Sequence, residues 1–311
     1  MPNFLIIGAP KAGTTALYQY LKQHPQIYMS PVKEPGFFAF EGMKLDSGMP
    51  FDRSLKERPT DSIERYQYLI SNAITDLETY QDLFASVSNQ IAIGEASPGY
   101  LYHPKACERI HHYIPDAKLI AILRHPVDRA YSSFVHRVQQ NLEPITDFNQ
   151  VIQKEDFRVK DVWWGTRHYV RVGFYCAQIK RYLDTFDKQQ LKVYLYEDLA
   201  SNPVKLIQDI FQFIGVDETV VPDVSTKHLV SGIPKSKFWH NFLNRKSPIK
   251  DILKQLIPAK IGKQITSDLR KRNLTKPPLS PDIRRQLIEV YKEDILNLQD
   301  LIDRDLSIWL K

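Results

Sequence analysis

The sequence predicts an α/β fold of three layers, in which helices cover both faces of a central parallel sheet. Two observations support this prediction. Short apolar segments that suit buried strands alternate with longer segments of helical periodicity. The first apolar segment also leads directly into a loop bracketed by two glycines, which is typical of a P-loop-like nucleotide site. Because we find no internal repeat and no convincing linker, we expect a single domain over residues 1–311.

The strands are expected where apolar residues form runs that are too short for a helix. Four consecutive apolar residues at 4–7 suit a strand buried on both faces, as in a parallel sheet. The run at 118–123 is the clearest strand in the chain. The other expected strands are 27–29, 91–97 and 191–196.

The helices are expected between these strands and at the end of the chain. Pro104 and Pro126 suit the first turns of two helices, since a first-turn residue does not need its N–H group. In the final segment, apolar residues recur at helical spacing from Ile283 to Leu306. The expected helices are 14–24, 74–84, 104–113, 126–136, 169–186, 203–214 and 282–310.

Two segments lack such a pattern, and one of them carries the basic excess of the chain. Residues 41–75 are weakly patterned and polar, and we expect an insertion over one face. Residues 222–281 are loop-rich and basic. Within them, 235–276 hold 12 basic and 2 acidic residues, leaving 30 of 42 basic and 34 of 36 acidic residues elsewhere. This favours an anionic ligand or surface nearby, although a solvated lysine-rich face has the same composition.

The composition is that of an ordinary globular protein. The two cysteines, Cys107 and Cys176, are too few for a disulfide framework and lack zinc-site spacing. The first strand begins at Phe4, which leaves no room for a signal peptide, and no apolar run approaches the roughly 20 residues of a membrane span. We therefore expect a cytoplasmic protein without a transmembrane segment.

The loop after the first strand has the features of an anion site. Residues 8–15 read Gly-Ala-Pro-Lys-Ala-Gly-Thr-Thr and open a helix, so that backbone N–H groups and the positive end of the helix dipole meet at one point. The spacing of the glycines is nearly that of a nucleoside triphosphatase, but Thr14 stands where such an enzyme has its lysine. The lysine lies within the loop instead, as Lys11.

Residues 10–17, Pro-Lys-Ala-Gly-Thr-Thr-Ala-Leu, resemble the 5′-phosphosulfate loop of the sulfotransferases that use 3′-phosphoadenosine 5′-phosphosulfate (PAPS). The resemblance implies that this loop binds the donor, and that Lys11 stabilises the charge on the leaving phosphate. No metal is required, because the migrating group is close to neutral SO₃. The donor-binding residues implied are Lys11, Ala12, Gly13, Thr14, Thr15 and Ala16.

A second motif lies at the end of the strand at 118–123. Residues 123–132, Leu-Arg-His-Pro-Val-Asp-Arg-Ala-Tyr-Ser, resemble the 3′-phosphate motif of the same family, which implies that Arg124 and Ser132 bind that phosphate. A guanidinium offers two parallel donors and a hydroxyl adds a third, which suits a phosphate. Ligands of open α/β sheets bind beyond the carboxyl ends of the strands, so Arg124 and Lys11 are expected at the same edge.

The acceptor needs a base, and the sequence offers several candidates. Glu34 is the first choice, because residues 34–38, Glu-Pro-Gly-Phe-Phe, match the Glu-x-x-Phe-Phe sequence of heparan-type sulfotransferases. Glu95 aligns with the family's Glu-Lys-Ser/Thr-x-x-Tyr strand end and is a second candidate, or it positions the acceptor. Since the family's lysine is Ala96 here, a polysulfated glycan is disfavoured. His168 and His136 are reserve candidates, because cytosolic arylsulfotransferases use a histidine.

The resemblance also assigns a role to the basic segment. In the family, this part of the chain closes over the adenosine and the 3′-phosphate, and so 222–281 is expected to be a lid with Lys235 and Lys237 near the donor. Lys33 is a candidate to bind the sulfonate or Glu34.

The function expected from the resemblance is the transfer of a sulfuryl group from PAPS, releasing 3′,5′-adenosine bisphosphate (PAP), to a hydroxyl or amine of a small-molecule, glycan or lipid acceptor. Two alternatives stay open, a P-loop kinase of small molecules and a non-catalytic nucleotide-binding protein. Nucleic acid is not expected as a partner, since the basic segment has no recognised motif. The oligomeric state stays open, with a homodimer among the alternatives.

Overall fold

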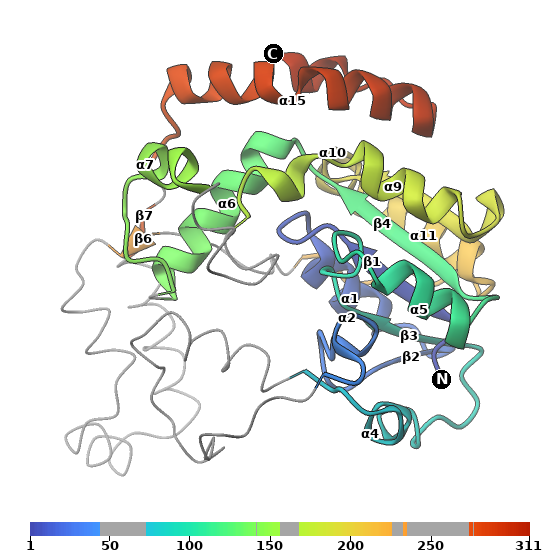
Figure 1. Ribbon diagram of the computed structural model, residues 1–311. Coiled ribbons are helices and arrows are strands. Elements are labelled where there is room, and N and C mark those ends of the chain that lie inside the picture. Colours follow the sequence, from blue (N-terminus) through green and yellow to red (C-terminus); the bar gives the residue numbers. More distant parts are fainter. Residues whose placement is uncertain (44–72, 141, 156–167, 226–232, 235–273, 276) are drawn as a thin grey trace, which may run out of the picture.

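A five-stranded parallel sheet forms the centre of the protein (Figure 1). The computed structural model describes residues 1–43, 73–140, 142–155, 168–225, 233–234, 274–275 and 277–311. The strand order is β2-β3-β1-β4-β5. The strands are β1 (Phe4–Gly8), β2 (Ile27–Met29), β3 (Ala92–Ala96), β4 (Lys118–Leu123) and β5 (Leu191–Leu195). All five segments expected as strands are confirmed.

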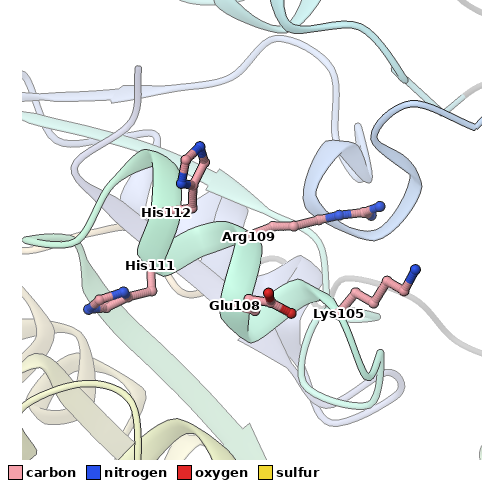
Figure 2. Close-up of a pocket in the computed structure, with 5 residues that line it drawn as sticks. All are labelled: Lys105, Glu108, Arg109, His111 and His112. Atoms are coloured by element: carbon pink, nitrogen blue, oxygen red, sulfur yellow. The ribbon is translucent and has the colours of Figure 1, made fainter.

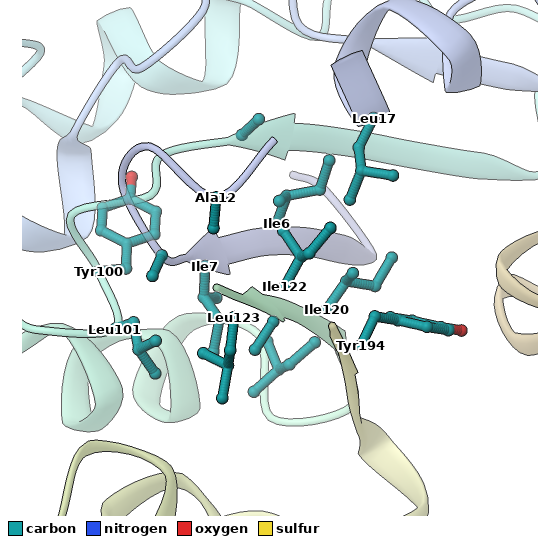
Figure 3. Packing of buried hydrophobic residues seen from close by; sticks show 14 of the residues in the cluster. Ile6, Ile7, Ala12, Leu17, Tyr100, Leu101, Ile120, Ile122, Leu123 and Tyr194 are labelled. Carbon is teal, nitrogen blue, oxygen red and sulfur yellow. The ribbon is translucent and has the colours of Figure 1, made fainter. Parts of the chain in front are cut away.

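The first strand lies at the middle of the sheet and pairs with a strand on each side. Leu5 is opposite Glu95 of β3 and Leu119 of β4. Every residue of β1 is buried, and Figure 3 shows Ile6 and Ile7 packed among side chains of β4. The chain passes from β3 across β1 to β4, and a sheet with such a change of direction binds ligands outside the carboxyl ends of its strands. The loop after β1 therefore begins at the place where ligands of such sheets bind.

Helices cover the sheet on both faces, as predicted. In Figure 1, α5 (Ala106–Tyr113) and α9 (Cys176–Leu183) lie in front of β4, and α11 (Pro203–Ile214) lies behind it. On the face of α11 lies α1 (Thr14–Leu21), which contacts that helix. The other helices are α2 (Phe37–Phe40), α4 (Leu77–Asp82), α6 (Pro126–Gln139), α7 (Phe148–Gln153), α10 (Tyr196–Ser201) and α15 (Pro281–Ile302).

The helix expected over 169–186 is shorter than predicted. A 3₁₀ turn, η1 (Arg171–Gly173), precedes α9, and the two are separate. The Asp294 carboxylate of α15 accepts hydrogen bonds from the N–H groups of Tyr175 (2.8 Å) and Cys176 (3.2 Å), and so α9 begins there. A side chain from a distant part of the chain thus sets this boundary, and local periodicity could not reveal it.

Other boundaries also differ from the prediction, among them those of α4 (expected over 74–84), α5 (expected over 104–113) and α6 (expected over 126–136). The first helix ends at Leu21, before the expected 24. The final helix ends at Ile302 because Asp303 adopts a left-handed conformation (φ 52°), and a short turn, η3 (Ser307–Leu310), follows. Helix α10 was not predicted, since its first residue, Tyr196, continues the apolar run of β5. No helix within the described ranges is long and apolar enough to span a membrane.

Within the basic segment, the structure describes residues 222–225, 233–234, 274–275 and 277–281. Two of these stretches, β6 (Ile233–Pro234) and β7 (Leu274–Thr275), pair as antiparallel strands. Strand β6 contacts α6, and the Tyr131 hydroxyl of α6 donates to the Pro277 carbonyl (2.7 Å). Both ends of the expected lid are thus attached to the helix that carries Ser132. Residues 235–273, with Lys235 and Lys237, and most of the expected insertion (44–72) lie outside the described residues.

Candidate active site

The loop between β1 and α1 presents backbone N–H groups at the carboxyl edge of the sheet. Gly13 precedes α1 in a left-handed conformation (φ 101°) and supplies no capping side chain. The first N–H groups of α1, from Thr14 and Thr15, have no carbonyl partner within a helix, and the helix dipole is positive there. A Cβ atom at Gly13 would lie 2.9 Å from Leu199 Cδ2, so the loop also packs closely against α10. This geometry suits a bound anion.

Lys11 is held within the loop in an uncommon conformation. Its φ is 71°, a left-handed value that few residues other than glycine adopt. The pKa of Lys11 is lowered from 10.5 to about 8, mainly because the amine is buried. The Glu34 charge opposes this shift, and the charges of Lys33 and Arg124 add to it. A lysine with this pKa is both a cation and a ready hydrogen-bond donor near neutral pH. These electrostatic interactions also place Glu34 and Arg124 near Lys11.

Arg124 follows β4 and is fixed by contacts on several sides. Its Nη1 donates to the Lys11 carbonyl (3.2 Å), and its guanidinium lies 4.6 Å from the centre of the Tyr196 ring. The Tyr175 hydroxyl donates to the Arg124 carbonyl (3.0 Å). Ser132 is buried in α6. The two motifs expected to bind phosphates thus meet through the bond between Arg124 and Lys11.

Glu34 lies on a loop that is bonded to the end of β3. Its N–H donates to the Ala96 carbonyl (3.0 Å), its carboxylate pairs with Lys33, and its side chain is 57% exposed. The backbone φ is 61°. Among the described residues other than glycine, the three with positive φ are Lys11, Glu34 and Asp303. Since unfavourable backbone conformations cluster at functional sites, this observation supports Lys11 and Glu34 as a pair.

Glu95 is fully buried beneath this loop. Hydroxyl groups surround its carboxylate: Tyr80 donates to Oε1 (3.3 Å), Ser97 donates to Oε2 (2.9 Å), and Tyr100 is a third partner. The pKa of Glu95 is raised from 4.5 to about 7, mainly because the carboxyl is buried. The hydrogen bonds from the three hydroxyls oppose this rise, and the Glu34 charge adds to it. Tyr100 is the tyrosine of the sequence motif that contains Glu95, whereas Tyr80 was not predicted as part of the site.

The two histidine candidates for the base, His168 and His136, have hydrogen-bond contacts with residues other than Lys11, Glu34 and Glu95. His168 Nδ1 is 2.6 Å from the Tyr102 hydroxyl, and burial, with the Arg171 charge, lowers its pKa. His136 Nε2 is 2.9 Å from Gln140 Nε2, one helical turn further along α6.

A pocket around α5 does not take part in this site. Figure 2 shows His111 and His112 on different sides of the helix, so the side chains that line the pocket do not converge. Arg109 is occupied by the carbonyls of Phe38 (3.1 Å) and Ala39 (2.9 Å) and by the Glu41 carboxylate (3.1 Å). The pocket lies beside the helix that supports α2, and we assign no chemistry to it.

Tyr196 is a site residue that the sequence did not reveal. Its ring lies under the Arg124 guanidinium, and a Cβ atom at Gly13 would come within 3.3 Å of it. It thus touches both phosphate motifs. The available signal was an aromatic residue at the carboxyl end of a core strand, but the same residue also suits ordinary core packing.

The sheet, the loop after β1 and the arginine after β4 define an α/β protein with a P-loop-like anion site. Comparison with known protein families shows which family the chain belongs to. The model of the sulfotransferase family matches residues 2–220, about 70% of the chain. The chain therefore belongs to the sulfotransferase family, and the predicted enzyme class is confirmed at this level.

Similar proteins carry the same family name. A solved structure of a sulfotransferase from Alicyclobacillus acidocaldarius is 32% identical, covers 100% of this chain and 99% of its own, and gives a TM-score of 0.72. The mouse bifunctional heparan sulfate N-deacetylase/N-sulfotransferase 4 is 27% identical over all of this chain and 31% of its own length. Human carbohydrate sulfotransferase 15 is 29% identical over 70% of this chain and 44% of its own. The chain thus spans about a third to under a half of these two curated relatives.

Proposed function

We propose that the protein transfers a sulfuryl group from PAPS to a hydroxyl or amine of an acceptor, and releases PAP. The observation that carries this proposal is the hydrogen bond from Arg124 to the Lys11 carbonyl, 3.2 Å long. It joins two anion-binding elements at one sheet edge, and PAPS has two phosphate groups, one at each end of its ribose, that could occupy them. ATP has no 3′-phosphate for the second element.

The donor would be held mainly by the loop after β1 and by α6. The N–H groups and hydroxyls of Thr14 and Thr15 would bind the 5′-phosphosulfate, with Ala12, Gly13 and Ala16 forming the rest of the loop. Arg124 and Ser132 would bind the 3′-phosphate. The attachment of β6, β7 and Pro277 to α6 supports a lid role for the basic segment, with Lys235 and Lys237 as proposed donor contacts.

The reaction would be an in-line displacement through a loose transition state, as in phosphoryl transfer. The bond between sulfur and the bridging oxygen of the donor breaks as the acceptor oxygen or nitrogen bonds to sulfur. The acceptor proton passes to the Glu34 carboxylate. Lys11 stabilises the negative charge that develops on the leaving phosphate oxygen. Since none of these steps uses a metal ion, we expect none to be required.

The class of acceptor stays broad: a small molecule, a glycan or a lipid. The names of two relatives mention heparan sulfate and carbohydrate, which supports a glycan. However, Ala96 is fully buried, and its carbonyl accepts the Glu34 N–H. This position offers no cation to an acceptor, and so a weakly charged acceptor suits it better than a polysulfated one.

A calorimetric comparison of PAP with ADP would test this proposal. We expect PAP to bind much more tightly than ADP, with an affinity that EDTA leaves unchanged and that Arg124→Ala weakens. Equal affinities, or ADP binding that depends on magnesium, would instead favour the small-molecule kinase. Tight PAP binding together with no PAP release from PAPS in the presence of a broad set of acceptors would favour a non-catalytic nucleotide-binding protein.

A further inference from the structure

We propose that Glu95 is a positioning residue, which orients the hydroxyls of Ser97 and Tyr100 so that they hold the main chain on both sides of the Glu34 loop. The proposal rests on the proposed function, in which Glu34 is the base. This role differs from that of a base or of a ligand for the acceptor, because a fully buried carboxylate does not contact the acceptor.

The hydroxyl groups around Glu95 have a second set of partners on the Glu34 loop. The Gly36 N–H donates to Ser97 Oγ (3.2 Å), and the Phe38 N–H donates to the Tyr100 hydroxyl (3.4 Å). Each hydroxyl thus lies between the Glu95 carboxylate and one backbone N–H group. Together with the bond from the Glu34 N–H to Ala96, three backbone N–H groups within 34–38 are bonded to the segment 96–100.

The charge of Glu95 sets the direction of these bonds. An ionised carboxylate only accepts hydrogen bonds, so the hydroxyls that face it donate their single hydrogen to it. Their oxygen lone pairs are then left for the N–H groups of the loop. In Glu95→Gln, the amide NH₂ group would donate a hydrogen bond to one of these hydroxyls. The hydrogen of that hydroxyl would then have no acceptor at position 95. One of the two bonds to the loop would weaken as a result.

The conformation of Glu34 explains why such support is needed. A positive φ is unfavourable for a residue with a side chain and persists only where surrounding contacts fix it. Glu34 (φ 61°) and Gly36 (φ 72°) both adopt it, within two residues of each other. The half-exposed side chain of Glu34 forms an ion pair with Lys33. Because this contact is exposed, it orients the Glu34 side chain only weakly. The bonds to Ser97 and Tyr100 therefore carry the orientation of the base.

The groups that face Glu95 make the device sensitive to pH. They are the hydroxyls of Tyr80 from α4 and of Ser97 and Tyr100 after β3, with the Glu34 charge nearby. Burial raises the pKa of Glu95 to about 7. Protonation below that pH gives the carboxyl a hydrogen of its own, which must then occupy one of the hydroxyl oxygens. We therefore expect the support of the loop to weaken as the pH falls through about 7.

The test measures the loop and the reaction separately, in the full chain. Glu95→Gln and Ser97→Ala should raise the hydrogen-exchange rate of the Gly36 and Phe38 amides about tenfold. Both should lower the kcat of PAP release from PAPS by tenfold or more, with a KM for PAPS within about twofold. Ser97→Thr, which keeps the hydroxyl, should restore both values. In a plot of kcat against pH, the acidic limb near pH 7 should move in Glu95→Gln.

Tyr194→Phe is the control, because it removes a part-buried hydroxyl bond to the Asp209 carboxylate, between β5 and α11, which carry no residue of this cluster. Unchanged exchange and kcat in folded Glu95→Gln would overturn the proposal, as would a change in KM alone. If Glu95→Gln does not fold, the pair Ser97→Ala and Ser97→Thr decides it. If the wild-type protein releases no PAP from PAPS, the proposed function fails, and the exchange rates still show whether Glu95 holds the loop.

Discussion

The two sides of the site are built in different ways. On the side proposed for the donor, the loop after β1 and the arginine after β4 come from short stretches of sequence, and the loop presents the first backbone N–H groups of α1. On the side proposed for the acceptor, the Glu34 loop is bonded to the hydroxyls of Ser97 and Tyr100, and these hydroxyls, with that of Tyr80, surround the Glu95 carboxylate. The side proposed for the donor is thus set by local backbone geometry, whereas the side proposed for the acceptor depends on long-range side-chain contacts.

The largest expected effect is that of removing the Lys11 amine, whose charge lies between the two sides. Lys11→Ala should lower the kcat of PAP release from PAPS by about 10²–10³, because it removes a preorganised donor to the leaving oxygen. The affinity for PAP, measured by calorimetry, should change far less. Lys22→Ala, which removes an exposed lysine at the end of α1, is the control. An equal loss in both variants would contradict the assignment.

The next effect should appear in binding alone. Arg124→Ala should weaken PAP binding about 10- to 100-fold, since it removes charge-assisted hydrogen bonds to a phosphate. Arg124→Lys should recover only part of the affinity, because an ammonium lacks the planar pair of donors. Arg285→Ala, on the exposed side of α15, should leave the affinity unchanged. If the two alanine variants behave alike in calorimetry, Arg124 is not part of the donor side.

A smaller effect should follow from the backbone of the donor loop. Gly13→Ala forces a side chain into φ 101° and brings its Cβ to 2.9 Å from Leu199 Cδ2. We expect it to lower the free energy of unfolding in urea by about 1–3 kcal/mol. Gly99→Ala is a matched control, because no heavy atom lies within 4 Å of the added Cβ. Equal stabilities would show that the loop adjusts without strain.

The smallest effect is a pH dependence that distinguishes the two sides. Lys11 has a pKa of about 8, so the protonated donor is lost as the pH rises through that value. The kcat of PAP release should fall about fourfold between about pH 7 and 8.5. Lys11→Arg, which stays protonated, should have lower activity but no such fall. A fall that persists in Lys11→Arg would assign the alkaline limb to another group.

This comparison also explains which parts could be predicted from the sequence. Lys11, Gly13 and Arg124 stand in short motifs whose spacing follows directly from a strand, a turn and a helix, so their placement could be expected. The contacts of Glu95 were only partly predictable. Tyr100 stands in the same motif as Glu95, but Tyr80 reads as an ordinary core aromatic until the fold brings its hydroxyl to the Glu95 carboxylate. The start of α9 was missed for the same reason, since Asp294 accepts its N–H groups from far along the chain.

The left-handed backbone at Lys11 and Glu34 has a consequence for protein engineering. Glycine is the residue that adopts this conformation without cost, and replacing either side chain with glycine should therefore raise the melting temperature slightly. A library screened only for heat resistance would accumulate glycine at exactly the two positions where the chemistry needs an amine and a carboxylate. Any thermostable variant selected in this way must also be screened for PAP release, or the selection will enrich inactive protein.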